Sequence, residues 1–447
     1  MSKGSTESYV LDNGAKIAVI GGGPTGSFFS IFALKMAKML DKEINLTIFE
    51  PKDFTKEGPA SCNRCGGIIS ELLVQTLAVE GMNLPDSVVQ RGINSYELHT
   101  DYGSVHIATP SLEKKIATVY RGGGPKGMGG EKESFDNFLV SEAVSEGAVH
   151  ERLKIDSIVY RNKRPVLYSQ GQEIMDADLV VGAFGVNSPT AKIIEEINFG
   201  YKKPETVSTA IAELGYTKDV VDNYFGKSVH LFLLPLKNIK FAAMIPKQSY
   251  VTLCILGRDI NANTVKNFME SPVVREVLPD KIPLEPACRC LPKMNVRAPE
   301  RPFADRMVMC GDAGSTRLFK DGIGAAYIMG KAAAKTAIFN GVSEHDFQTN
   351  YYPVYKSLII DNMFGKFLYA FTNLYQHREA FTRMMLGVVR KEQSRDDNNR
   401  KVLSSILWDM FTGNERYKNV FFRAFDMGMN LDQIKELTKN LIRRDHV

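Results

Sequence analysis

Apolar residues near the N-terminus change their spacing twice, which predicts a strand, a helix and a second strand in succession. Lys16–Ile20 and Ile44–Phe49 are short apolar runs typical of buried strands. Between them, apolar side chains recur at helical spacing, namely Phe28, Phe29, Phe32, Leu34, Met36 and Met39. A run of three glycines and a proline separates the first strand from the helix. This order of parts is that of a nucleotide-binding αβ unit.

The glycines of the turn have the spacing Gly21-x-Gly23-x-x-Gly26, and each position has a physical reason. Gly21 permits the tight turn, Gly23 lets the backbone approach a pyrophosphate, and Gly26 lets the helix pack closely on the strand. Free N–H groups at the helix start favour a phosphate. Glu50 ends the second strand, where a carboxylate can accept hydrogen bonds from ribose hydroxyls. We therefore expect FAD or NAD, rather than NADP, on Gly21, Gly23, Pro24, Thr25, Gly26 and Glu50.

A second segment of this kind lies far along the chain. Met307–Cys310 is a short apolar strand, followed by a Gly-Asp pair, a loop and the Gly-Ile-Gly start of a small-residue helix. The segment resembles the flavoproteins of the para-hydroxybenzoate hydroxylase superfamily. The resemblance implies FAD as the cofactor, with Asp312 on its ribityl chain and the helix start at the flavin pyrimidine ring, where it would stabilise negative charge. The residues so implied are Gly311, Asp312, Gly322, Ile323 and Gly324.

A third buried-type strand, Leu179–Ala183, leads into a departure from that superfamily. The superfamily often has Ala-Asp-Gly at this point, whereas this chain has Ala183-Phe184-Gly185. The missing carboxylate predicts that NADPH is a poor direct reductant. A ferredoxin-like or flavoprotein electron donor is the partner expected in its place.

Within the superfamily the chain looks most like the geranylgeranyl reductase family, whose members reduce carbon–carbon double bonds of isoprenoid chains. The segment Cys65-Gly66-Gly67 resembles the family's Cys-Gly segment beside the flavin. Arg121, followed by the helical pattern Ser134–Ala148, resembles the family's Arg and Phe-Asp helix. The resemblance therefore places Arg121 among the cofactor-binding residues and Cys65, Gly66 and Gly67 at the catalytic centre.

The same resemblance indicates a substrate pocket. Lys240–Gly257 is similar to the Tyr-x-Trp-x-Phe-Pro strand that lines the lipid pocket of the family. By position, the pocket residues are Phe241, Ala243, Ile245 and Pro246. Ala243 stands where the family has Trp, so we expect a wider or differently shaped pocket. A glycine-rich insertion, Arg121–Glu133, is a second departure and is expected to be a surface loop.

The pair Cys62-x-x-Cys65 stands out in a chain of six cysteines, and several explanations of it stay open. The family resemblance favours Cys65 as an active-site thiol that helps to deliver a proton while the flavin delivers a hydride. Inert packing and a Cys62–Cys65 redox pair are alternatives. An iron–sulfur or zinc site completed by Cys288 and Cys290 is a further alternative. No metal site is assigned.

The succession of elements predicts an α/β fold with a Rossmann-like FAD-binding domain, an inserted β-sheet-rich domain and a helical C-terminal region. We expect the FAD-binding domain over residues 14–200 and 300–342, the substrate-binding sheet domain over 201–299, and helices over 343–447. In the helical region, one stripe of apolar residues is either core or lipid-facing, with core favoured. It consists of Phe364, Phe367, Leu368, Phe371, Leu374 and Tyr375.

Composition and charge narrow the partners. The 447 residues carry a net charge of +5, which is too small to indicate nucleic acid. From residue 376 onward there are 14 Lys+Arg against 10 Asp+Glu, an excess that suits an anionic membrane surface or an acidic protein. Neither a signal peptide nor a spanning segment is expected. The location predicted is cytoplasmic, with peripheral contact at the inner membrane surface as a further expectation.

These observations predict an FAD-dependent oxidoreductase that reduces double bonds of an isoprenoid or similar apolar substrate, such as a lipid. The sequence is also compatible with two alternative functions. One is a flavin monooxygenase, or hydroxylase, of the same fold. The other is an electron-transfer flavoprotein subunit that works with a protein partner, which the altered Ala183-Phe184-Gly185 and the paired cysteines favour.

Overall fold

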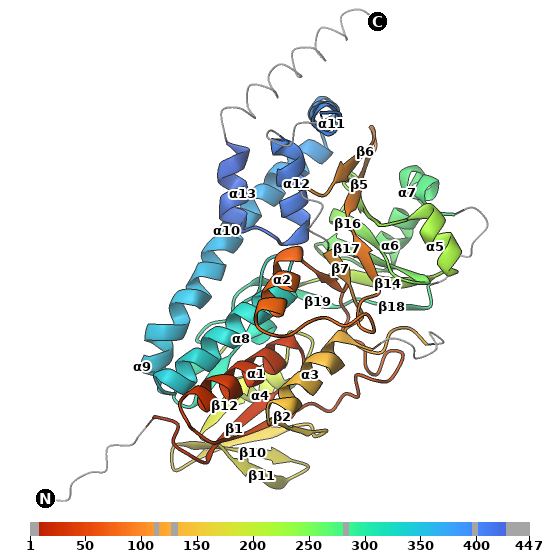
Figure 1. The fold of residues 1–447 in the computed structure, drawn as a ribbon. Coiled ribbons are helices and arrows are strands. Elements are labelled where there is room, and N and C mark those ends of the chain that lie inside the picture. The colour runs from red at the N-terminus through yellow and green to blue at the C-terminus, as the bar shows by residue number, and fades with distance from the viewer. Residues whose placement is uncertain (1–8, 111–115, 127–132, 280–285, 396–400, 426–447) are drawn as a thin grey trace, which may run out of the picture.

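The computed structural model describes residues 9–110, 116–126, 133–279, 286–395 and 401–425. Two large sheets lie one above the other in Figure 1, and C-terminal helices run along both. The predicted α/β class with a helical C-terminal region is confirmed. Residues 127–132 of the glycine-rich insertion and the last 22 residues of the predicted helical region lie outside the described part.

The lower sheet has six strands, and the first predicted strand lies inside it. Its order is β20 (Phe303–Ala304), β21 (Met307–Met309), β12 (Leu179–Gly182), β1 (Ala15–Ile20), β2 (Ile44–Phe49) and β8 (Val149–Glu151). All neighbours pair in parallel except β20 and β21. The carboxyl ends of β1, β2, β12 and β21 therefore meet at one edge, where open α/β sheets bind ligands.

Alternation along the strands divides the core of this sheet into two faces. Ile17 and Val19 face α1 (Pro24–Met39), α3 (Phe135–Ser145) and α8 (Gly322–Phe339). Ala18 and Ile20 face a small sheet on the other side, made of β9 (Ser157–Arg161), β10 (Arg164–Ser169) and β11 (Gln172–Asp176), together with α4 (Thr190–Glu196). Residues two apart along a strand share a face, so a continuous apolar run here means burial on both sides.

The upper sheet has seven strands. Its order is β18 (Cys288–Cys290), β14 (Ala210–Gly215), β17 (Tyr250–Gly257), β16 (Ile239–Pro246), β15 (Ser228–Phe232), β5 (Ser95–Thr100) and β6 (Gly103–Ala108). The pairing differs from the predicted division of the chain in one respect. Strands β5 and β6 come from within residues 14–200, yet they hydrogen-bond into this sheet because β5 pairs in parallel with β15. The predicted domain boundaries otherwise remain predictions.

Short elements connect the two sheets. Three two- or three-residue strands form a small sheet between them, namely β3 (Ile68–Ile69), β7 (Ile116–Thr118) and β4 (Arg91–Ile93), and α2 (Glu71–Val79) follows β3. A second connection pairs β13 (Glu205–Ser208) with β19 (Lys293–Arg297). The chain thus crosses between the layers several times, and both sheets contribute residues to the region between them.

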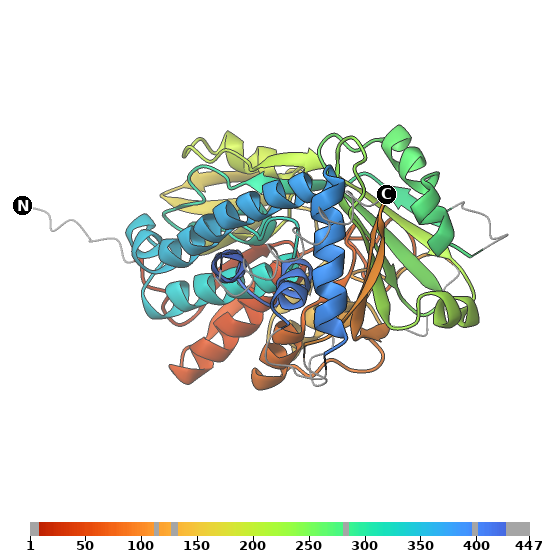
Figure 2. The ribbon, with the colours of Figure 1, turned by 90° about the horizontal axis from the view of Figure 1, so that it is seen from above.

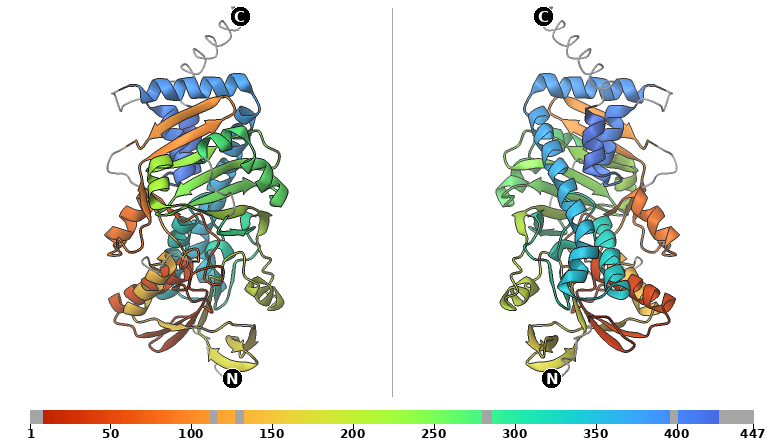
Figure 3. Two further views of the ribbon diagram at one scale, coloured as in Figure 1. Left: turned by 90° about the vertical axis from the view of Figure 1, so that its right-hand side faces the viewer. Right: turned by 90° about the vertical axis from the view of Figure 1, so that its left-hand side faces the viewer.

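Helices cover both faces of the upper sheet. One face packs on α5 (Lys218–Tyr224), α6 (Ala262–Met269) and α7 (Pro272–Val277). The other packs on four helices, α10 (Tyr352–Gln376), α11 (Glu379–Gln393), α12 (Val402–Thr412) and α13 (Tyr417–Ala424). A short α9 (Glu344–Asp346) and a π-helical turn (Phe347–Tyr351) lead into α10. Figure 1 shows α10 running from the lower layer towards the upper sheet, Figure 2 shows, from above, α11 crossing the end of α10 at a steep angle, and Figure 3 shows α11 across the far end.

No helix among the described residues is long and apolar enough to cross a membrane.

Candidate functional site

The predicted dinucleotide turn has the geometry that its glycines imply. Gly21 has φ +108°, and a Cβ there would lie 2.5 Å from the Ala183 carbonyl oxygen on the neighbouring strand end. A Cβ at Gly26 would overlap the Gly21 carbonyl. Pro24 and Thr25 form the buried first turn of α1. Only glycine fits at 21 and 26, so the turn holds the start of α1 against the edge of the sheet.

Polar side chains from four segments gather in front of this turn. The Glu50 carboxylate accepts hydrogen bonds from two backbone N–H groups, that of Gly22 at 3.1 Å and that of Lys52 at 2.9 Å. Arg121 donates twice to the Asp136 carboxylate, at 3.0 and 2.9 Å, and its Nη2 lies 3.2 Å from where a Gly23 Cβ would stand. A cation therefore lies at the position where Gly23 is expected to approach a pyrophosphate.

The Arg121–Asp136 pair is buried and held from both sides. Asp136 on α3 is fully buried, and Asn63 donates a third hydrogen bond to the same carboxylate. Burial raises the pKa of Asp136, although Arg121 lowers it. Burial lowers the pKa of Arg121, but Asp136 and Cys65 more than offset this, so its net pKa is raised. The sequence analysis identified Arg121 but missed Asp136 and Asn63, although Asp136 is the acid of the Phe-Asp helix.

The second glycine-containing segment packs directly on the first. Gly311 has φ +59°, and a Cβ there would overlap the Thr25 hydroxyl. Asp312 is half-buried, its pKa is raised by burial and lowered by Arg121, and its carbonyl accepts from Asn295 at 2.8 Å. The fold thus brings the two predicted cofactor segments together. Asn295 is a further residue that the sequence analysis did not identify.

The start of α8 is more enclosed than expected. Asp321 has φ +47° and caps the helix by accepting the N–H of Gly324 at 3.1 Å. Arg317 pairs with Asp321 at 2.6 Å and donates to the Gly413 carbonyl at 2.7 Å. The turn between α12 and α13 therefore lies against the helix start. Of the three predicted residues there, Gly324 already has its N–H bonded to a carboxylate.

The predicted catalytic segment and the predicted substrate strand meet. A Cβ at Gly66 would lie 2.9 Å from the Cys254 sulfur and 3.1 Å from Ile245 Cδ1. Gly67 has φ +72°, so this position also favours glycine. Cys65 is half-buried, and its sulfur accepts the Gly67 N–H at 3.4 Å. The segment that leads into β3 and the strands β16 and β17, about 180 residues away in the sequence, thus form one corner between the sheets.

Aromatic side chains cover the predicted substrate face. Phe241, Ala243 and Ile245 alternate on one face of β16 and are all buried, and Pro246 ends the strand. The Phe241 ring stacks on Tyr369 of α10 at 5.7 Å and meets Phe411 of α12 edge-on at 5.2 Å. The C-terminal helices therefore fill the space beside Phe241, although the substitution at Ala243 predicted a wider pocket. The substrate role of these residues remains a prediction.

A buried ion pair lies behind this corner and was not predicted. Lys247 follows β16, is fully buried, and has its Nζ 3.7 Å from the Glu213 carboxylate and 3.8 Å from the centre of the Tyr120 ring. Its Nζ has no hydrogen-bond partner among the described residues and lies 3.4 Å from where a Gly67 Cβ would stand. Glu213 accepts from Thr252 at 2.8 Å. No sequence signal marked this lysine as buried, because lysine is almost never fully buried unless paired and its partner lies on another strand, β14.

The cysteines are all unpaired. Cys62 and Cys65 are half-buried, as are Cys288 and Cys290 on the edge strand β18. Burial raises the pKa of Cys288 to about 11 and of Cys290 to about 12, so both are protonated thiols at neutral pH. Within the described ranges, no group of three or more His, Cys, Asp or Glu could hold a metal ion. The alternative of an iron–sulfur or zinc site at Cys62, Cys65, Cys288 and Cys290 therefore gains no support from the structure.

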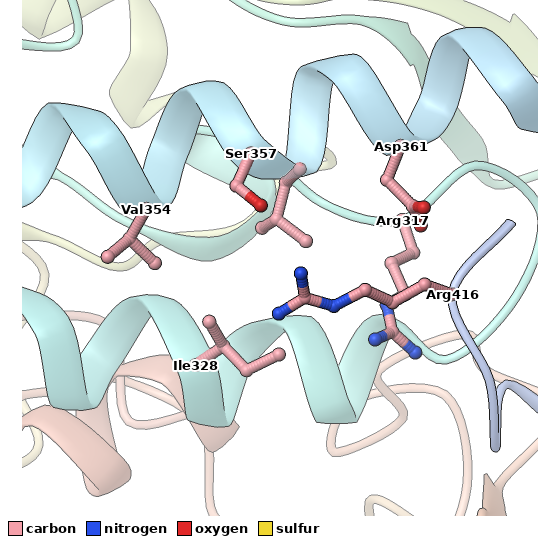
Figure 4. Close-up of a pocket in the computed structure, with 7 residues that line it drawn as sticks. Arg317, Ile328, Val354, Ser357, Asp361 and Arg416 are labelled. Carbon is pink, nitrogen blue, oxygen red and sulfur yellow. The ribbon is translucent and has the colours of Figure 1, made fainter. Parts of the chain in front are cut away.

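Two cavities outside this site are visible. A cavity of about 30 Å³ lies between α8 and α10 and is lined by Arg317, Ile328, Val354, Ser357, Leu358, Asp361 and Arg416 (Figure 4). An open hollow of about 410 Å³ lies beside β11, near Lys16. Neither is lined by a residue that the sequence analysis assigned to the cofactor or substrate.

Solved structures identify the class of fold to which this arrangement belongs. A geranylgeranyl bacteriochlorophyll reductase-like protein from Thermoplasma acidophilum is 15% identical, with a TM-score of 0.59 over 95% of this chain and 99% of that one. The p-nitrophenol 4-monooxygenase of Pseudomonas putida is 11% identical, with a TM-score of 0.59 over 91% and 100%. A mutant of the halogenase PltM, in complex with FAD, is 12% identical, with a TM-score of 0.60 over 92% and 85%.

The chain therefore has the fold of the FAD-dependent oxidoreductases. At these identities the likeness is one of fold, and reductases, monooxygenases and halogenases share it. No family model matches the chain, and no curated protein matches it by sequence.

Proposed function

We propose that this protein is an FAD-dependent oxidoreductase that reduces carbon–carbon double bonds of an isoprenoid or similarly apolar substrate. The observation that carries the proposal is the corner where Cys65-Gly66-Gly67 meets the apolar face of β16, close to the two glycine-rich segments. An apolar wall with the thiols of Cys65 and Cys254 beside it suits an uncharged, unsaturated chain. Aromatic rings of α10 and α12 extend the wall.

The residues present fit FAD. Positions 21, 26 and 311 form a close-packed cradle in which a Cβ would collide with backbone or with Thr25. Arg121 would bind the pyrophosphate, Glu50 the ribose, and Asp312 a ribityl hydroxyl, each through a charge-assisted hydrogen bond. FAD, when bound, supplies the hydride for the reduction.

Cys65 would hold the proton that the substrate carbon needs. Its side chain is half-buried and lies in the segment that contacts Ile245 and Cys254. A thiol carries a transferable proton, so Cys65 is proposed as the general acid for this carbon. Gly66 and Gly67 let this segment pack closely on Cys254, Ile245 and the Val119 backbone, which fixes the position of Cys65 in the corner.

Reduction by a protein donor fits the chain better than direct reduction by NADPH. Phe184 stands where the resembled superfamily has a carboxylate, and the one other GxGxxG match, at residues 122–127, belongs to the glycine-rich insertion. A ferredoxin-like or flavoprotein donor is therefore the proposed partner. Fast bleaching of the flavin by micromolar NADPH under anaerobic conditions would contradict this part of the proposal.

A monooxygenase is the second candidate, because solved monooxygenases share the fold to the same degree. Anaerobic and aerobic stopped-flow experiments separate the two. The reduced protein should transfer electrons to a polyprenyl substrate without oxygen, and on mixing with oxygen it should show no hydroperoxide absorbance. Oxygen-dependent incorporation of a hydroxyl group into an aromatic substrate would establish the second candidate instead. A colourless protein that ignores added FAD would contradict both.

A further inference from the structure

An apolar surface extends over two of the C-terminal helices. It consists of Ile360, Met363, Phe367 and Phe371 on α10, with Phe422 and Phe425 at the end of α13. Their exposed fractions run from 43% to 58%. We call these six residues the C-terminal apolar surface. In the right-hand view of Figure 3, α10 and the α12–α13 pair face the viewer with the upper sheet behind them.

This surface is held in place by packing. On α10 its members recur at intervals of three and four residues, so they share one helical face. Phe371 packs on Phe425 at 6.0 Å, and Phe367 packs on Phe421 at 6.3 Å. The apolar stripe predicted from Phe364 to Tyr375 is therefore divided into a buried part and an exposed part. Leu368 is buried against the sheet, whereas Phe367 and Phe371 face outward; the side chains of residues 374–375 lie outside the description.

The exposed charged side chains of α10 and α13 are of one sign. Lys356 and Lys366 on α10 and Lys418 on α13 are exposed. The single carboxylate of α10, Asp361, is 5% exposed and accepts the backbone N–H groups of Tyr417 and Lys418 at 3.1 and 2.9 Å. Helix α13 contains no acidic residue. Aromatic side chains beside lysines, without an exposed carboxylate on either helix, complement an anionic surface with an apolar interior.

Other occupants match these charges less well. A second copy of the chain would bring lysines against lysines. Residues 426–447 follow Phe425 directly, but they contain four Lys/Arg and four Asp/Glu, so they have no net negative charge to offer.

We propose that the C-terminal apolar surface docks on an anionic lipid bilayer, with its phenylalanines among the upper acyl groups and the lysines at the lipid phosphates. The same helix links this surface to the candidate site, because Tyr369 of α10 stacks on Phe241 from the inner side. Docking would thus bring the predicted substrate strand within one helix diameter of the membrane. The docking itself does not depend on the proposed reaction.

The test is vesicle co-sedimentation of the full chain, which requires neither turnover nor bound FAD. The protein should bind vesicles of phosphatidylcholine with phosphatidylserine, bind phosphatidylcholine alone much more weakly, and be released by salt. Phe367→Ser and Phe371→Ser should each weaken binding by about tenfold or more. Lys366→Gln and Lys418→Gln should each weaken it by about fivefold. Because all four positions are exposed, folding should be retained, which circular dichroism can verify.

Matched controls lie elsewhere on the molecule. Phe339→Ser alters a phenylalanine exposed to 43% at the end of α8, and Lys192→Gln an exposed lysine on α4; neither should change binding. Equal binding to neutral and anionic vesicles, or none at all by the full chain, would overturn the proposal. So would a dimer in gel filtration that Phe367→Ser dissociates, because a second copy would then occupy the surface. Loss of reductase activity alone would bear on the proposed function and not on the docking.

Discussion

The buried pair Lys247–Glu213 allows a prediction whose size follows from the structure. Neither side chain has more than 8% of its surface exposed, and the Nζ lies 3.7 Å from the nearer carboxylate oxygen. Removing one partner of a buried pair leaves the other as an uncompensated charge, which typically costs about 3–5 kcal/mol. We therefore expect Lys247→Met and Glu213→Gln each to lower the free energy of unfolding by several kcal/mol.

The two single variants should not be equal. In Lys247→Met the carboxylate still accepts a hydrogen bond from Thr252 at 2.8 Å and can also take up a proton. In Glu213→Gln the ammonium loses its counter-charge and keeps only a neutral amide oxygen and the Tyr120 ring beside it. Glu213→Gln should therefore cost more. The double variant should recover part of the loss, since no buried charge remains unpaired.

The pH dependence of Lys247→Met gives a further check. Burial raises the pKa of Glu213, while Lys247 lowers it, so removing the lysine should raise this pKa further. The folded state then holds a proton that the unfolded chain releases above its ordinary pKa of 4.5. The stability of the variant should consequently fall as pH rises, and its deficit should be smaller at about pH 5 than at about pH 8.

Urea denaturation followed by circular dichroism, at both pH values, measures these differences. Lys266→Met is the matched control, because its ammonium is largely exposed and surface changes are usually within about 0.5 kcal/mol. Additive losses in the double variant, or single-variant losses no larger than the control, would show that Lys247 and Glu213 do not depend on each other.

Three further predictions concern the site and its surroundings. Cys65→Ala should slow substrate reduction by about 10²–10⁴-fold while FAD stays bound, whereas Cys62→Ala should be nearly silent; anaerobic single-turnover kinetics would reveal equal defects if the two form a redox pair. Asp312→Ala should weaken FAD binding by about 10–100-fold, as the loss of a hydrogen bond to a charged group implies, and unchanged retention on titration would remove Asp312 from the cofactor site. Burial lowers the pKa of Lys320 from 10.5 to about 7, so the folded chain releases this proton first and stability should rise with pH between these values. Lys320→Met should flatten that slope in thermal unfolding, and an unaltered slope would show that Lys320 does not cause it.

Features that depend on neighbouring residues in the chain were predictable. Ile44–Phe49 is a strand with the expected bounds, and the first strand differs from prediction by one residue. Gly21 and Gly26 are at positions where a side chain would collide with backbone, as their spacing in the turn indicates. Such features follow from the period of the apolar residues and from local backbone sterics, which a sequence displays directly.

What a residue meets across the fold could not be read in this way. β5 and β6 join the upper sheet because β15 lies beside them, and no pattern within residues 95–108 records that partner. The burial of Lys247 depends on Tyr120 and Glu213, which are separated from it by 127 and 34 positions and brought to it by two different strands. The stripe on α10 could be assigned to a helix but not divided into its buried and exposed parts, because its period is the same whether a sheet, a lipid or water covers each side. The sequence alone was sufficient for the elements and for the glycine-rich turns, where the physics is local; the pairing of charges and the outward face of the C-terminal helices are set by contacts between distant segments, which only the folded chain brings together.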